Sequence, residues 1–253
     1  MRNRWLAAAL AAMVLAGGAM GQTTLKLAAA ADLEPVLPPV LQQFEAQTGI
    51  RVVATYQASA MLTTQIMNGA PFDLFLAADM GFPARVVKAG LAMEPVPVPY
   101  AKGTLVLWTR KDSGLEPPSL DLLRSPQLKR LAIANPDRAP YGRAAVTALR
   151  SLGLYDALKE RIVQAENIGQ TAEFVESGNA QAGLIALTAA QTPALLHAGQ
   201  YFVIPRNLYP PIEQGAVVLR ASAHGAEAQR LLTYLLSQPV QAQLAAHGLS
   251  PVR

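Results

Sequence analysis

Three apolar runs in the first third of the chain constrain its fold more than any other feature. They span residues 25–27, 50–56 and 71–79, and each is followed by a turn or cap and then by a helical pattern. Buried strands that alternate with helices are typical of a parallel sheet whose two faces are both covered by helices. The sequence therefore predicts an α/β fold.

Small residues precede several of the expected helices. Four alanines lead to Asp32, Ala58 precedes Ser59, and turns that contain glycine lie at residues 141–142 and 168–169, before the next helices. The first N–H groups of a helix have no partner within the helix and carry the positive end of its dipole, so they can hold an anion. Ser59 could cap its helix or turn its hydroxyl toward a ligand, and both readings stay open.

Two segments rich in proline and tyrosine divide the chain. Residues 94–100 alternate proline with other residues and cannot be helical, and residues 209–212 repeat this composition about a hundred residues later. We interpret them as two crossings between two α/β lobes. Lobe 1 is expected to comprise residues 22–102 with 216–253, and lobe 2 residues 103–215. A cleft between lobes, lined by helix N-termini, is a natural ligand site.

The first 21 residues are predicted to be a signal peptide. Arg2 and Arg4 precede an uncharged run, and the small residues at 19 and 21 fit a cleavage site before Gln22. A retained membrane anchor is the alternative, but the apolar run is short for a bilayer span. The chain has no cysteine, which excludes disulfides, thiol catalysis and a lipid on a cysteine near the cut.

Charge gives no indication of a nucleic-acid partner. The chain carries 21 basic and 17 acidic residues, and loss of the leader with its two arginines leaves it close to neutral. No interleaving of aromatic and basic residues typical of RNA binding is present. A cluster of basic residues could steer an anion or contact a permease, but a solvated face is the simpler interpretation: Arg124, Lys129, Arg130, Arg138, Arg143 and Arg150.

An exported hydrolase is the hypothesis from a different functional class. The three histidines, His197, His224 and His247, are too widely spaced for an H-E-x-x-H zinc site. Ser59 does not lie in a G-x-S-x-G motif. We therefore expect that the protein is not an enzyme.

Several motifs together resemble one family. The stretches 27–33, 56–60, 69–79, 88–92 and 135–137 read LAAAADL, YQASA, GAPFDLFLAAD, KAGLA and NPD. In this order they are similar to the periplasmic molybdate-binding proteins of ABC importers, over almost all of residues 22–253. The resemblance implies a two-lobed periplasmic-binding-protein-like (type II) fold that closes on molybdate or tungstate by hydrogen bonds, without lysine or arginine. It further implies a periplasmic monomer that requires no cofactor and serves an inner-membrane permease and its ATPase.

The resemblance also implies which residues bind the ligand. The serine of the family's second loop falls on Ser59, and two backbone N–H donors fall on Tyr141 and Ile168. Asp32 takes the position of a serine in the first loop. Further candidates are Ala31, Ala58, Ala186 and Thr188.

Two positions depart from the family pattern. Ala186 replaces a tyrosine, whose hydroxyl could be supplied by Tyr141 or Thr188. Asp32 places a carboxylate where a dianion is expected, which costs on the order of 4 kcal/mol per unit charge at 4 Å and an effective dielectric of 20. Asp32 could cap its own helix, it could be protonated in the closed cleft, or the ligand could be other than a dianion. We expect the first, with Glu34 as the partner, while the backbone N–H of Asp32 serves the ligand. A receptor for another oxyanion or a small organic solute is the alternative.

Overall fold

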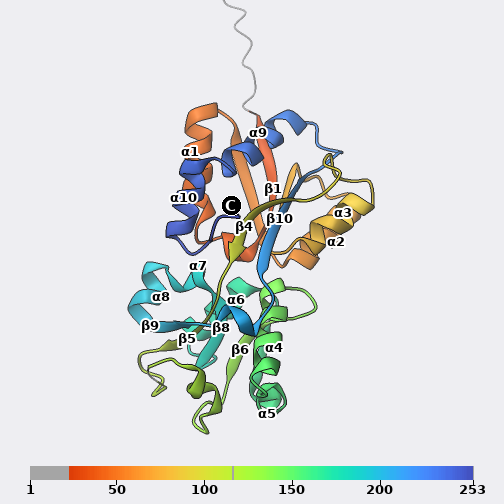
Figure 1. Ribbon diagram of the computed structural model, residues 1–253. Coiled ribbons are helices and arrows are strands. Elements are labelled where there is room, and N and C mark those ends of the chain that lie inside the picture. Colours follow the sequence, from red (N-terminus) through yellow and green to blue (C-terminus); the bar gives the residue numbers. More distant parts are fainter. Residues whose placement is uncertain (1–22, 116, 253) are drawn as a thin grey trace, which may run out of the picture.

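The protein folds into two lobes, each built on one β-sheet (Figure 1). The structure is a computed structural model that describes residues 23–115 and 117–252. The predicted signal peptide lies outside the described residues. Within them, no helix is both long enough and apolar enough to span a bilayer.

The bounds of the elements follow the chain. The strands are β1 (Thr24–Ala30), β2 (Arg51–Gln57), β3 (Leu74–Ala77), β4 (Val98–Gly103), β5 (Leu105–Arg110), β6 (Leu131–Ala134), β7 (Ile162–Ala165), β8 (Ala182–Ala186), β9 (Gly199–Val203) and β10 (Ile212–Val218). The α-helices are α1 (Leu37–Thr48), α2 (Ser59–Met67), α3 (Gly81–Lys88), α4 (Pro140–Ser151), α5 (Tyr155–Leu158), α6 (Ile168–Glu176), α7 (Leu187–Ala190), α8 (Pro193–Ala198), α9 (Gly225–Leu235) and α10 (Gln238–Ala246). The 3₁₀ turns are η1 (Ala31–Leu33), η2 (Leu120–Arg124), η3 (Lys159–Arg161) and η4 (Arg206–Leu208).

The two sheets share one plan. The first has the order β2-β1-β3-β10-β4 and the second β7-β6-β8-β5-β9. In each sheet the first three strands are parallel, and the fourth is antiparallel to its neighbours. Parallel strands place their carboxyl ends, and the turns that lead into the following helices, at one edge. In both lobes this edge faces the other lobe, as the positions of Ala31, Ser59, Tyr141 and Ile168 show.

Both faces of each sheet are buried. Along β1, Leu25, Leu27 and Ala29 pack in the core with α1, α9 and α10, whereas Ala28 packs in the core with α2 and α3. Along β5, Leu107 and Trp108 likewise point into different cores. Alternate side chains of a strand point to opposite faces, so strands with two covered faces are apolar throughout. This explains the uninterrupted apolar runs of the sequence.

The lobes are joined by two crossings. The first is short, because β4 ends at Gly103 in the first sheet and β5 begins at Leu105 in the second. The second runs from β9 to β10. Ile212, the first residue of β10, already pairs with Gly103 in the first sheet. The first sheet, that of lobe 1, thus includes residues 212–215, which the sequence analysis assigned to lobe 2.

The first helix differs from its prediction. The helix expected from Asp32 is a 3₁₀ turn, η1, and α1 begins only at Leu37. Pro38 and Pro39 fill the early positions of α1, where proline is tolerated because its missing N–H would have no partner there. Gly49 ends α1, with the positive φ of 71° that favours glycine.

Candidate functional site

A small cavity lies where the two lobes meet. Its walls come from the turns after β1, β2 and β3 in lobe 1 and from the starts of α4 and α6 in lobe 2. The lining residues are Ala30, Ala31, Asp32, Gln57, Ala58, Ser59, Ala78, Ala139, Pro140, Tyr141, Asn167 and Ile168. Lysine and arginine are absent from this set. An anion here would be held by hydrogen-bond donors and helix dipoles alone.

Three helix N-termini from the two lobes converge on this cavity. Ser59 is the first residue of α2, Ile168 is the first of α6, and Tyr141 is the second of α4. At these positions the backbone N–H has no partner within its own helix. The structure thus brings together four sequence-predicted residues, Asp32 included, that are spread over residues 32–168 of the chain.

Ser59 does not cap its helix. The N-cap position of α2 is Ala58, which has no side-chain cap, and the Ser59 Oγ accepts a hydrogen bond from the N–H of Ala78 at 3.0 Å. A hydroxyl that accepts one hydrogen bond keeps its own proton to donate. Ser59 is buried and lines the cavity, so this proton is available to a ligand there.

The start of α6 is fixed by Asn167. Its side-chain oxygen accepts a hydrogen bond from the N–H of Gln170 at 2.9 Å, a standard N-cap contact. This contact and the Asn167 carbonyl satisfy donors further into the helix, the N–H groups of Gln170 and Thr171. The cap fixes the position of the α6 N-terminus, and the N–H of Ile168 remains available to another acceptor.

Asp32 does not cap η1, so the predicted capping role is wrong. Its Oδ2 accepts hydrogen bonds from Gln214 Nε2 at 2.5 Å and from the Tyr141 hydroxyl at 3.1 Å. The Tyr100 hydroxyl contacts Gln214 Oε1 at 2.6 Å and thereby orients the amide toward Asp32. Glu34 donates its N–H to the carbonyl of Ala31 and takes no part in this contact. The carboxyl instead links both lobes.

Among the described residues, no lysine or arginine lines either cavity that Asp32 borders. Only 1% of Asp32 is exposed, and its Oδ1 is buried without a hydrogen-bond partner. Burial raises the pKa of Asp32 from 3.8 to about 6, and the hydrogen bonds from Gln214 and Tyr141 and its own backbone offset only part of this effect. Burial and the nearby Asp32 carboxylate also raise the pKa of Tyr100 and Tyr141 well above 10, so both phenols stay protonated.

The two hydroxyls expected to replace the missing tyrosine are already engaged. The Tyr141 hydroxyl contacts Asp32 Oδ2, and the Thr188 Oγ1 donates to the Asp32 carbonyl at 2.8 Å. Ala186 lines a second, adjoining cavity with Ala31, Asp32 and Ile168. Neither Ala186 nor Thr188 is among the residues that line the first cavity.

Gln214 and Tyr100 are residues around Asp32 that the sequence analysis missed. Both are buried polar side chains in strands of the first sheet, and a hydrogen bond joins them. Gln214, directly before the apolar residues 215–219, was the available signal, because a buried polar group needs a partner.

Comparison with known proteins assigns the family. A family model described as bacterial extracellular solute-binding protein matches residues 25–250. The chain belongs to this family. The molybdate-binding protein of Azotobacter vinelandii is 36% identical to this solute-binding protein over 243 residues, 96% of each chain. That of Rhodobacter capsulatus is 35% identical over 192 residues, 76% of this chain and 74% of the relative.

Solved structures agree with the fold. The periplasmic molybdate-binding protein of Azotobacter vinelandii superposes with a TM-score of 0.86 at 34% identity, covering 90% of this chain and all of that one. The sulfate-binding protein of Mycobacterium tuberculosis has a TM-score of 0.78 at 19% identity, with coverage of 91% and 87%, and is similar in fold alone. The predicted two-lobed fold and the resemblance to molybdate-binding proteins are confirmed.

An ion pair joins the lobes of this solute-binding protein at the rim of the site. Arg143 on α4 pairs with Asp79, which follows β3, and its guanidinium lies 5.3 Å from the centroid of the Phe82 ring. The N–H of Ala60 also crosses the gap, to the carbonyl of Arg138 at 3.2 Å. These contacts exist only when the lobes are together.

The rim pair is expected to have a small effect on affinity. Arg143→Gln should weaken ligand binding by about 2- to 5-fold, since partly exposed ion pairs contribute about 0.2–1 kcal/mol. The loss should shrink in high salt, where the pair is screened. Titration at two ionic strengths tests this, with Arg150→Gln as the control, because Arg150 packs on Tyr155 within lobe 2. Equal losses in the two variants would contradict a specific role for the rim.

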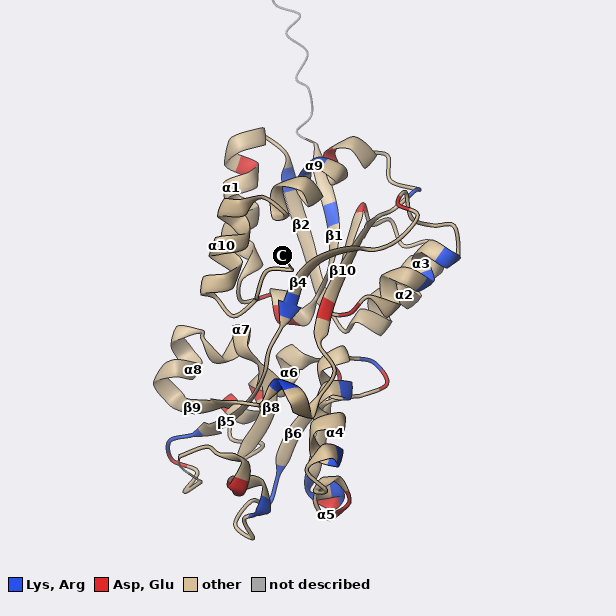
Figure 2. Ribbon diagram, in the orientation of Figure 1, with Lys and Arg blue, Asp and Glu red and all other residues tan. Residues whose placement is uncertain are grey.

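The other basic residues of lobe 2 do not form a continuous charged face. Arg138 pairs with Glu166, and Arg130 donates to the carbonyl of Asn179 at 3.1 Å. Figure 2 shows lysine and arginine interspersed with acidic residues over the molecule. These observations favour a solvated face.

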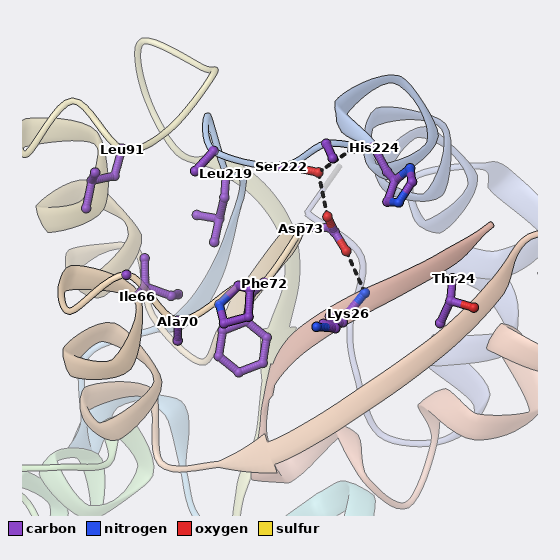
Figure 3. A pocket seen from close by; sticks show the side chains of 14 residues that line it. Thr24, Lys26, Ile66, Ala70, Phe72, Asp73, Leu91, Leu219, Ser222 and His224 are labelled. Atoms are coloured by element: carbon purple, nitrogen blue, oxygen red, sulfur yellow. Dashed lines mark hydrogen bonds between the residues drawn. The ribbon is translucent and has the colours of Figure 1, made fainter.

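A larger pocket of this solute-binding protein lies at the opposite end of the first sheet (Figure 3). Its one buried acid, Asp73, accepts hydrogen bonds from the Lys26 N–H at 2.7 Å and from the Ser222 hydroxyl at 2.5 Å. Both carboxylate oxygens are therefore satisfied. His224 lies in this wall, away from His197 and His247, and no group of histidine and acidic residues within the described part of the chain could hold a metal ion.

Proposed function

We propose that this protein captures molybdate, and tungstate of nearly the same size, outside the cytoplasm. The observation that carries the proposal is the convergence of the α2, α4 and α6 N-termini, with the Ser59 hydroxyl, on one cavity that has no basic side chain in its wall. The chain is also about a third identical, over its whole length, to the molybdate-binding protein of Azotobacter vinelandii. Molybdate is here the transported cargo and not a cofactor, and the protein has no enzymatic role.

The ligand would be held by neutral donors from both lobes. We infer that Ser59 contributes its hydroxyl, and that Ser59, Tyr141 and Ile168 contribute backbone N–H groups, with Ala31, Asp32 and Ala58 shaping the wall. Helix N-termini stabilise an anion through N–H groups and their dipoles, and their fixed geometry selects by cavity size between oxyanions of equal charge. The division into moving lobes, residues 22–102 with 216–253 against 103–215, is part of this proposal.

Closure would then couple binding to transport. A ligand that contacts donors on both lobes favours the closed state by its differential affinity for that state. We propose that the leader directs the protein to the periplasm and is cleaved, and that the closed monomer delivers molybdate to an inner-membrane ABC permease and its ATPase. Membership of the bacterial extracellular solute-binding family supports a location outside the cytoplasm.

Thermal unfolding with and without ligand tests the substrate. At a molybdate concentration one hundred times the Kd, the native state gains about 2.7 kcal/mol. For a protein of this size, the Tm should rise by about 5–10 °C. Sulfate at the same concentration and ionic strength is the control and should raise the Tm much less. An unchanged Tm at millimolar molybdate, with no response in titration, would remove the assignment.

A further inference from the structure

The environment of Asp32 determines where its carboxyl can carry a proton. Oδ2 is contacted by Gln214 Nε2, which can only donate, and by the hydroxyl of Tyr141. The Tyr100 hydroxyl contacts Gln214 Oε1 and so keeps the amide nitrogen on the Asp32 side. Because Oδ2 already receives two hydrogen bonds, a proton on this carboxyl belongs on Oδ1.

Oδ1 is the atom of this carboxyl that remains for a ligand. It is buried and has no hydrogen-bond partner, and Asp32 lines both the cavity at the helix N-termini and the adjoining one. An ionised Oδ1 would repel an oxyanion, and a protonated Oδ1 would need an acceptor. An oxygen atom of the bound oxyanion meets the second requirement.

From this geometry we propose that the oxyanion binds together with one proton, shared between Asp32 Oδ1 and a ligand oxygen. The inference rests on the proposed function. No covalent bond other than that to the proton changes, and above neutral pH the proton comes from solvent because molybdate is fully deprotonated there. Asp32 thereby becomes a specificity-determining residue that favours oxyanions whose oxygens accept this proton.

Other ionisable groups near Asp32 do not take over its proposed role as the carrier of the shared proton. Tyr100 on β4 and Tyr141 on α4 face the carboxyl, but burial raises their pKa values well above 10. Tyr56 on β2 has its pKa raised to about 12 by burial and by Glu34. The adjoining cavity alone is lined by Glu34, Glu173 and Glu176. From α7, Thr188 contacts the Asp32 backbone, but its hydroxyl does not titrate. Tyr209 lies next to Tyr141, and the rim arginines pair with other acids.

The sign of the pH dependence follows from the protonation state of the free protein. Burial raises the pKa of Asp32 to about 6, so between pH 7 and 9 the unliganded protein is mostly ionised at this position. Binding must then take up close to one proton. Molybdate affinity should fall about tenfold for each pH unit in this range, and should level off as the pH drops below 6.

Isothermal titration with sodium molybdate in two buffers of different ionisation enthalpy counts these protons. At pH 8 the wild-type protein should take up close to one proton per molybdate. Asp32→Asn supplies an amide donor that does not titrate, so this variant should take up no proton when it binds molybdate. Its affinity should be the same from pH 7 to 9, and at pH 8 it should exceed the wild-type affinity by about tenfold or more. Glu34→Gln is the matched control and should keep the wild-type pH slope.

Each result has a distinct meaning. A wild-type protein that binds molybdate with no proton uptake and no pH slope would overturn the inference and leave the proposed function intact. Proton uptake that persists in folded Asp32→Asn would also overturn it, because another group would then carry the proton. Absence of molybdate binding by the wild type even at pH 6 would instead refute the proposed function. If Asp32→Asn does not fold, the wild-type proton count alone decides.

Discussion

Replacing Ile168 with proline is expected to weaken molybdate binding by about 10- to 100-fold while the fold is kept. The substitution removes one backbone N–H, and hydrogen bonds to charged groups contribute about 1.5–3 kcal/mol. Proline is well tolerated at the first position of a helix, which Ile168 occupies in α6. Asn167 before it is already extended, with φ of −149° and ψ of 177°, the region that a following proline prefers.

Ile168→Val is the matched control for this experiment. It trims the buried side chain but keeps the N–H, so its affinity should stay within about twofold of the wild type, and its stability should fall by about 0.5–1.5 kcal/mol. Titration with molybdate and circular dichroism of both variants separate binding from folding. Wild-type affinity in a folded Ile168→Pro protein would exclude this N–H as a ligand donor.

Gly142→Ala is expected to reduce molybdate affinity by roughly 100-fold and to destabilise the protein by about 1–3 kcal/mol. Gly142 lies in the first turn of α4, where a β-carbon would overlap the carbonyl oxygen of Ala134 and come within 2.9 Å of the carbonyl carbon of Asn135. These are backbone atoms, so α4 itself must move away from β6. Tyr141 moves with it, and a displacement of about 1 Å in a positioned group costs on the order of 100-fold.

Gly81→Ala supplies the control for the added methyl group. A β-carbon at Gly81, the first residue of α3, finds its nearest neighbour at 3.7 Å, an ordinary contact with Asp79. Stability should change by less than about 1 kcal/mol and affinity should not change. Denaturant unfolding and molybdate titration of both variants give the comparison. If Gly142→Ala binds as tightly as Gly81→Ala, the close approach of α4 to β6 does not position the site.

The chemistry of the cavity follows from the absence of lysine and arginine among the residues that line it. Lysine or arginine would bind many anions strongly at long range, whereas N–H groups with fixed directions require the oxygens of the ligand to lie at defined positions. The buried Asp32 makes this requirement stricter. A carboxylate charge about 4 Å from a ligand charge would cost on the order of 4 kcal/mol at an effective dielectric of 20. A shared proton removes that cost.

The sequence predicted the elements whose signal is local. The strands in the apolar runs 25–27, 50–56 and 71–79 were predicted correctly, because the apolar run of a buried strand depends on neighbouring residues. The 3₁₀ turn after β1 was not predicted, because Asp32 was expected to cap a regular helix. Strands β7 and β9 and helices α7 and α8 were missed, because each is short and its burial depends on distant partners.

The sequence by itself determined the α/β class, the two-lobed division and three helix N-termini at Ser59, Tyr141 and Ile168, since strand periodicity, small turns and proline positions act over a few residues. Only the tertiary structure decided the role of Asp32. Its partners Tyr141 and Gln214 lie 109 and 182 residues away in the chain, and burial by both lobes raises its pKa. Desolvation and hydrogen bonding depend on what surrounds a group in space, which no local pattern records.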